Sequence, residues 1–116
     1  MKQVSQDYQL RLHGYWRSSC TWRVRIALEL KRLPYEYIPV HLANAEQHGD
    51  AFVARNPLRQ VPVLEWRSGG QDNQLTQSLA ILRFLEGIAP EPSLEPASAF
   101  LAARAWEASE LINAGI

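Results

Sequence analysis

The spacing of apolar residues predicts a strand, a helix and a second strand in the first third of the chain. In residues 8–15 leucines alternate with polar side chains, which is typical of a strand that ends at Gly14. Residues 18–32 follow a helical period, and the proline that comes next is expected to stop the helix. Four residues are expected to form the inner face of this helix: Trp22, Ile26, Ala27 and Leu30. Residues 35–40 are rich in aromatic and β-branched side chains and predict a second strand, in which Pro39 favours an edge position.

The pattern then changes to one typical of a hairpin followed by a helix. Residues 50–55 indicate a short helix, and residues 61–66 predict a third strand. Turn-forming residues fill positions 68–73, so we expect a hairpin that returns through a short fourth strand at 74–76. Ser78 is expected to cap another helix. The inner face of that helix is expected to carry Leu79, Leu82 and either Phe84 or Leu85. The helix is expected to end at Gly87.

This order of elements, βαβ, then α, then ββα, predicts an α/β fold of the thioredoxin-like kind. One four-stranded mixed sheet is expected, with helices on both of its faces. We assign residues 8–88 to this domain and residues 89–97, which hold three prolines, to a linker. Residues 98–116 predict the first helix of a truncated, all-helical second domain.

Composition and charge exclude several classes of function. A chain of 116 residues is about one domain, and its twelve basic and twelve acidic residues argue against a general nucleic-acid binder. No apolar run approaches the roughly 20 residues that a membrane span needs, and the polar N-terminus has no secretory signal. A single cysteine excludes an internal disulfide and favours a cytoplasmic setting. The three histidines, His13, His41 and His48, show no ligand spacing, so we expect packing or surface roles and no metal site.

Three stretches carry candidate chemistry. Ser18, Ser19 and Cys20 come where the first helix begins, and the dipole of a helix N-terminus stabilises an anion or thiolate, although the same residues are also typical of a simple helix cap. The Val61-Pro62 bond opens the third strand and can be cis or trans. Ser78 opens a second helix, where a carboxylate can bind. A thiol site, a peptide-backbone site and a carboxylate site together favour a small anionic thiol peptide, for which glutathione is the obvious ligand.

The chain resembles a known family over nearly its whole length from about Leu10. The stretch SSCTWRVRIAL at 18–28 is similar to the signature of zeta-class glutathione transferases, whose members include maleylacetoacetate isomerases. The stretches NPLRQVPVL at 56–64 and QSLAI at 77–81 are similar to later motifs of the family, in the same order. The resemblance implies that glutathione is the cofactor.

The resemblance also implies roles for individual residues. It assigns six consecutive residues to glutathione binding: Ser18, Ser19, Cys20, Thr21, Trp22 and Arg23. Ser18, Ser19 and Cys20 are expected to surround the glutathione sulfur, with Arg23 behind them, and these four are the expected catalytic residues.

Further glutathione contacts are implied along the chain. Val61 is expected to pair its backbone with the tripeptide, and Gln77 and Ser78 to hold the γ-glutamyl end. Gln47 falls where the family has a glutamine that contacts glutathione, although the loop around it departs from the family's usual run.

The implied function is a glutathione-dependent cis–trans isomerase of maleylacetoacetate- or maleylpyruvate-type diacids, in aromatic amino-acid catabolism, with dehalogenation of α-halo acids as a side activity. Glutathione and a small acidic electrophile are then the ligands, and a homodimer is expected for the full-length protein. Arg17 and Arg23 are candidates for the substrate carboxylates. Two alternatives remain: a monothiol reductase that uses Cys20 as nucleophile, and a thioredoxin-like module that binds without catalysis.

Overall fold

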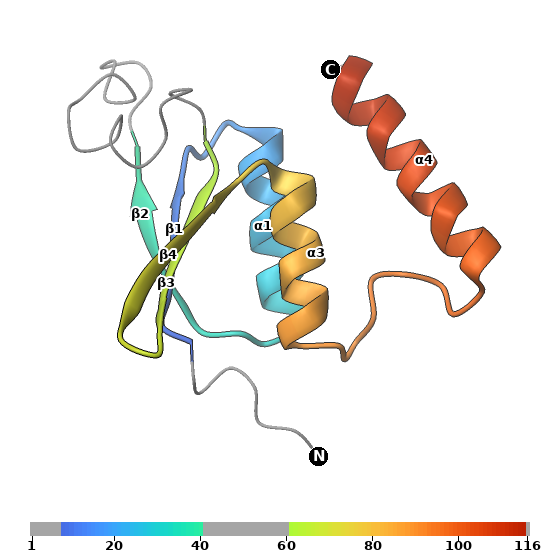
Figure 1. Ribbon diagram of the computed structural model, residues 1–116. Helices are drawn as coiled ribbons and strands as arrows, with labels where there is room; N and C mark the ends of the chain where they lie inside the picture. Colours follow the sequence, from blue (N-terminus) through green and yellow to red (C-terminus); the bar gives the residue numbers. More distant parts are fainter. Residues whose placement is uncertain (1–7, 41–60, 116) are drawn as a thin grey trace.

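A four-stranded mixed sheet organises the residues that the computed structural model describes, 8–40 and 61–115 (Figure 1). The elements are β1 (Leu10–Gly14), α1 (Ser19–Leu30), β2 (Tyr35–Pro39), β3 (Val63–Ser68), β4 (Gln71–Thr76), α3 (Ser78–Ile88) and α4 (Ala99–Gly115). The strand order is β2-β1-β3-β4, with β1 and β2 parallel and the other pairs antiparallel. The thioredoxin-like arrangement and the edge position of the strand that contains Pro39 are thus confirmed, and the short helix expected at 50–55 lies outside the described residues.

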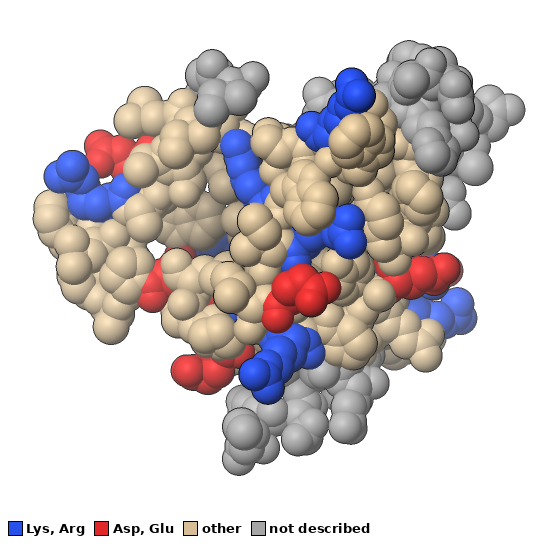
Figure 2. Space-filling view, turned by 180° about the vertical axis from the view of Figure 1, so that it is seen from behind, with Lys and Arg blue, Asp and Glu red and all other residues tan. Residues whose placement is uncertain are grey.

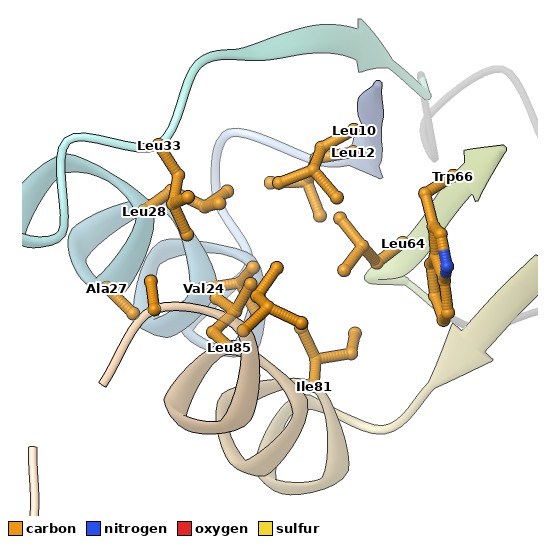
Figure 3. Close-up of a cluster of buried hydrophobic side chains, with 12 residues drawn as sticks. Leu10, Leu12, Val24, Ala27, Leu28, Leu33, Leu64, Trp66, Ile81 and Leu85 are labelled. Carbon is orange, nitrogen blue, oxygen red and sulfur yellow. The ribbon is translucent and has the colours of Figure 1, made fainter. Parts of the chain in front are cut away.

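The main core lies between one face of the sheet and the two adjacent helices α1 and α3 (Figure 3). The β1–β3 register places Leu12 opposite Leu64, so both side chains point to the helices. The largest fully buried aliphatic side chains of this core come from both layers: Leu12, Val24, Leu28, Leu64, Ile81 and Leu85. Burial of each such side chain stabilises the fold by about 1.5–3 kcal/mol, so this two-layer contact holds the starts of α1 and α3 in fixed positions.

The face of α1 that packs on the sheet is not the one that the sequence pattern predicted. Trp22, Ile26 and Leu30 are 44%, 55% and 54% exposed, whereas Val24 and Leu28 are fully buried. The two sets are offset by two residues, which is about 200° around a helix, so they lie on opposite sides. Because α1 carries apolar residues all round, periodicity alone could not select the buried side. The prediction for Trp22, Ile26 and Leu30 was wrong, whereas Ala27, which is 2% exposed, is buried as predicted. The sheet receives the smaller aliphatic side chains.

The β3–β4 hairpin is tighter than predicted. Its turn consists of Gly69 and Gly70, with φ of +58° and +79°, a conformation that glycine adopts without strain. Strand β4 therefore begins at Gln71 and not at 74, because the polar side chains of an open edge strand resemble a loop in sequence.

Helix α3 also differs from its prediction, since it passes through Gly87 to Ile88. Its inner face carries Leu85, as one of the two expected alternatives, together with Ile81, while Leu79 and Leu82 are only half-buried.

A buried lysine fixes the linker to the ends of α1 and α3. The Lys31 side chain is completely buried, and its Nζ donates to Glu86 Oε1 at 2.6 Å and to the backbone oxygens of Ala89 and Pro92, both at 2.7 Å. These three acceptors satisfy the three donors of the ammonium group. The linker therefore leaves α3 in a defined direction before α4 begins.

Helix α4 stands apart from the sheet and its two covering helices (Figure 1). Its large apolar side chains are mostly exposed: Phe100, Leu101, Leu111 and Ile112. Trp106 is half-buried, and its indole N–H donates to Glu95 in the linker while Arg83 of α3 lies over its ring at 5.6 Å.

Candidate functional site

The start of α1 presents the hydroxyl and thiol groups that the sequence singled out. Ser18 is the N-cap, and its Oγ accepts a hydrogen bond from the backbone N–H of Thr21 at 3.1 Å, which confirms the expected cap. Acceptance leaves the hydroxyl proton of Ser18 available for a further partner. Ser19 is exposed and Cys20 is half-buried, so all three groups lie at the positive end of the helix dipole.

Close packing between Gly14 and Thr21 fixes this helix start against the end of β1. Thr21 is fully buried, and its Oγ1 accepts from the backbone N–H of Tyr15 at 3.2 Å. A Cβ atom on Gly14 would lie 2.4 Å from Cγ2 of Thr21, closer than any relaxed contact permits. The Thr21 side chain therefore packs in the protein interior, and its contacts with Gly14 and Tyr15 fix the start of α1, where Ser18 is the N-cap.

Aromatic rings and guanidinium groups line the outer side of the helix start. The indole N–H of Trp22 donates to the backbone oxygen of Trp16, and Arg25 lies 4.8 Å from the Trp22 ring and 4.3 Å from that of Tyr37. Arg17 lies 4.7 Å from the Trp16 ring. These contacts keep cations on an exposed aromatic surface beside the cap.

Two pKa shifts accompany this cluster. The hydrogen bond with Tyr35 raises the pKa of Arg25, and burial raises the pKa of Tyr37. The arginine therefore stays charged and the phenol neutral throughout the physiological range.

Arg23 joins the start of α1 to the start of α3. Its Nη1 donates to Oγ of Ser78 at 3.2 Å, and Ser78 is only 4% exposed. The same nitrogen donates to Oδ1 of Asn113 in α4 at 2.7 Å. The first and third of the predicted stretches are therefore adjacent, and they are held together by a group that carries full positive charge.

The start of α3 differs from the prediction in one respect. Gln77, with φ of +72°, occupies the N-cap position, and Ser78 is the first residue of the helix. The expectation that Ser78 caps α3 was wrong, because its hydroxyl oxygen accepts from Arg23 instead. The first N–H groups of any α-helix lack partners within the helix, so the start of α3 keeps the donors that a carboxylate site needs.

The second predicted stretch opens β3, where the Val61-Pro62 peptide bond is cis. Val61 is half-buried against a small apolar cluster of Val40 and Val63, and Val63 pairs with His13 near the end of β1. This stretch therefore lies at the same end of the sheet as the start of α1. Gln47, His41 and His48 lie outside the described residues.

Sequence reasoning missed one group at the site and one elsewhere on the sheet. Asn113 was missed because a polar residue on a helix gives no sign of its tertiary partner. The second group lies on β1 and β3, where His13 Nε2 and Arg11 Nε contact Glu65 Oε1 at 2.8 Å and 3.3 Å. The alternation of β1 does place Arg11 and His13 on one face, opposite Glu65 once the register is known.

Several kinds of site receive no support from the described residues. In residues 8–40 and 61–115 no three histidine, cysteine or acidic side chains are grouped closely enough to hold a metal ion. No helix in those ranges has the length and apolar character needed to cross a membrane. Figure 2 shows acidic and basic side chains mixed over one face of the molecule instead of being segregated by sign.

Comparison with known proteins places this geometry in a family. The family model for the glutathione S-transferase N-terminal domain matches residues 17–88, which span α1, the sheet from β2 onward and α3. The chain belongs to this family. The resemblance to the zeta class, predicted from the motif at 18–28, is confirmed by relatives that carry that class name or the name maleylacetoacetate isomerase.

Individual relatives of this glutathione S-transferase domain are similar over most of its length. It is 40% identical to the probable maleylacetoacetate isomerase 2 of Drosophila melanogaster over 114 residues, which are 97% of this chain and 48% of the relative. A solved structure of maleylacetoacetate isomerase from Anaeromyxobacter dehalogenans 2CP-1, with GSH bound in its active site, matches with 49% identity and a TM-score of 0.82. That match covers 94% of this chain and 50% of the other. The chain thus spans about half the length of the relatives it matches.

Proposed function

We propose that this domain binds glutathione across the starts of α1 and α3. The observation that carries the proposal is the hydrogen bond from Arg23 to Ser78, which holds the two helix N-termini adjacent. In this arrangement Ser18, Ser19 and Cys20 receive the sulfur, Val61 receives the peptide backbone, and the γ-glutamyl end lies at Ser78. The related isomerase from Anaeromyxobacter dehalogenans, crystallised with GSH in its active site, supports the proposal.

Two further residues belong to the proposed glutathione site. Gln77 precedes Ser78 at the start of α3 and is proposed to contact the γ-glutamyl end. Gln47 is proposed from sequence position alone.

We further propose that the domain serves a longer isomerase that acts on maleylacetoacetate- or maleylpyruvate-type diacids. The Ser18 hydroxyl and the helix N-terminus would stabilise the thiolate of glutathione. The thiolate adds to one carbon of the activated double bond, and the π electrons move to the conjugated carbonyl as an enolate. The former double bond is now single and rotates. The enolate then restores the double bond and expels the thiolate, so the trans product forms without net redox change.

A larger helical unit is part of this proposal. The chain spans about half of its relatives, and α4 exposes Phe100 and Leu111 while α1 exposes Trp22 and Ile26. We propose that α4 is the first helix of a second domain, joined through the linker at 89–97, that covers these apolar side chains and supplies more of the substrate site. A cytoplasmic location and a homodimer of the full-length protein complete the proposal, and the single cysteine supports the former.

Calorimetric titration of the chain with glutathione tests the binding proposal. Ser18→Ala is expected to weaken glutathione binding and lower the thiolate fraction of the bound ligand, measured by ultraviolet absorbance. Cys20→Ala is the comparison variant, since it removes one of the three groups proposed to contact the sulfur but leaves the N-cap intact, and it is expected to weaken binding less than Ser18→Ala does. Absence of heat with wild-type protein at millimolar glutathione would refute the proposal.

The isomerase proposal is tested in a full-length protein that contains this domain. Glutathione-dependent loss of maleylacetoacetate absorbance is expected to fall more in Ser18→Ala than in Cys20→Ala. If activity instead vanished with Cys20 and a mixed disulfide were reduced, the monothiol reductase alternative would replace the isomerase. Glutathione binding without any turnover would favour a non-catalytic module.

A further inference from the structure

Asn113, near the end of α4, reaches the proposed carboxylate site through Arg23. A single guanidinium nitrogen, Nη1 of Arg23, donates to Asn113 Oδ1 at 2.7 Å and to Ser78 Oγ at 3.2 Å. Three helices therefore meet at this group: Arg23 lies on α1, Ser78 begins α3, and Asn113 belongs to α4. The shorter of the two bonds is the one to α4.

The position of α4 depends on polar contacts because apolar packing between α3 and α4 is incomplete. An open groove of about 350 Å³ separates the two helices, with Leu79 on one side and Trp106 on the other. At the linker end, Arg83 contacts Glu95 at 3.0 Å, and Glu95 in turn accepts from the Trp106 indole. The hydrogen bond between Arg23 and Asn113 holds the C-terminal end of α4, next to the proposed glutathione site.

The charge of Arg23 remains available to a ligand. Within the part of the chain that the structure describes, the two recorded acceptors of Arg23 are an amide oxygen and a hydroxyl oxygen, and both are neutral. A guanidinium group with neutral partners keeps its attraction for an incoming carboxylate. Anchoring by Asn113 also restricts a long side chain that otherwise has many rotamers, so less entropy is lost when the anion binds.

We propose that Asn113 is a positioning residue for the γ-glutamyl carboxylate of glutathione. It holds the Arg23 guanidinium against Ser78, so carboxylate binding at the start of α3 and docking of α4 stabilise each other. The coupling is reciprocal, because each event changes the free energy of the other by the same amount. This inference rests on the proposed glutathione function.

The test compares Asn113→Ala with Ser109→Ala, a matched control on the same helix whose Oγ bonds only to its own helix in the described structure. Calorimetry measures binding of glutathione and of an analogue in which the glutamyl α-carboxylate is an amide. Asn113→Ala is expected to weaken glutathione binding about three- to tenfold, the range for one ordinary intramolecular hydrogen bond, because Asn113 acts through Arg23 and does not touch the ligand. The same variant should change binding of the amide analogue less than about twofold, and Ser109→Ala should change neither.

A second measurement follows α4 directly by hydrogen exchange of its last two turns. Without ligand, exchange is expected to be faster in Asn113→Ala and in Arg23→Lys than in Ser109→Ala, because lysine keeps the charge but loses the planar fork. Glutathione should slow this exchange in the wild type and not in Asn113→Ala.

The two failures are distinguishable. Wild-type protein that takes up no glutathione would end the proposed function and this coupling together. Wild-type binding with equal glutathione affinities in Asn113→Ala and Ser109→Ala would overturn the coupling alone. An equal loss for glutathione and its amide analogue would also overturn it, since that result would indicate a general structural defect.

Discussion

Replacement of Lys31 by methionine tests the role of the buried ammonium at the base of the linker. Methionine preserves most of the side-chain volume and removes the charge together with three hydrogen bonds, to Glu86, Ala89 and Pro92. The Glu86 side chain is 15% exposed, so its carboxylate would lose its counter-charge in a largely buried position. The backbone oxygens of Ala89 and Pro92 would lose the same donor.

The expected cost follows from these contacts. Removal of one partner of a buried ion pair costs about 3–5 kcal/mol. Glu86 keeps hydrogen bonds from the backbone N–H of Leu94 at 2.8 Å and from the Ser93 hydroxyl at 3.1 Å. These two bonds favour a cost at the lower end of that range. We therefore expect Lys31→Met to lower the free energy of unfolding by about 3 kcal/mol. With an unfolding entropy of about 2.1 cal/mol/K per residue, this corresponds to a fall in Tm of about 12 °C.

Urea unfolding followed by circular dichroism, together with calorimetric Tm values, measures this effect. The control is Arg67→Met, which breaks the contact with Asp72 at 3.2 Å between side chains that are 58% and 70% exposed, and it should cost about 0.5 kcal/mol or less. The double variant Lys31→Met with Glu86→Gln should recover about 1–2 kcal/mol, because the uncompensated charge is gone. A loss below about 1 kcal/mol in Lys31→Met would refute the reasoning.

Three further predictions concern glycine positions and acid stability. Gly14→Ala should lower the free energy of unfolding by about 1–3 kcal/mol, because its Cβ would lie 2.4 Å from Thr21 Cγ2; an unchanged urea midpoint would show that β1 can shift away from α1. Gly70→Ala, at φ of +79° with no steric contact, should cost about 1 kcal/mol through backbone strain. The same substitution at the exposed helical Gly87 should raise the free energy of unfolding by about 0.5–1 kcal/mol. If Gly70→Ala and Gly87→Ala changed the free energy of unfolding in the same direction, this account would be contradicted. Burial raises the pKa of Glu86, but its hydrogen bonds outweigh burial and lower the pKa below the ordinary value of 4.5. Its contribution to stability is therefore complete above that pH and lost as the pH falls through the lowered pKa, so Glu86→Gln should flatten the acid side of a stability–pH profile.

Features governed by local rules were predictable from sequence. The Ser18 cap depends on a side chain and a backbone N–H three residues away, and proline at position 39 belongs on an edge strand for a local reason. The order of strands and helices followed from short-range periodicity. These predictions required no knowledge of which surfaces meet.

Features that depend on tertiary contact were not predictable in the same way. The buried side of α1 could not be chosen, because Trp22 and Val24 lie on opposite faces that are both apolar. A lysine after a helix is normally exposed, so nothing in the sequence identifies Lys31 as a buried anchor. The bonds from Arg23 to Ser78 and Asn113 join residues remote in sequence, and they decide how the candidate site is assembled.

The Gly69–Gly70 turn offers a practical attachment point for probes. The β1–β3 register places Val63 beside the end of β1, near the candidate site, whereas Ser68 lies five residues further along an antiparallel strand. At about 3.4 Å per residue, the turn is roughly 17 Å or more from that end of the sheet. Both glycines are exposed with open space around them, so a fluorophore or surface tether attached at this turn would lie outside the candidate site.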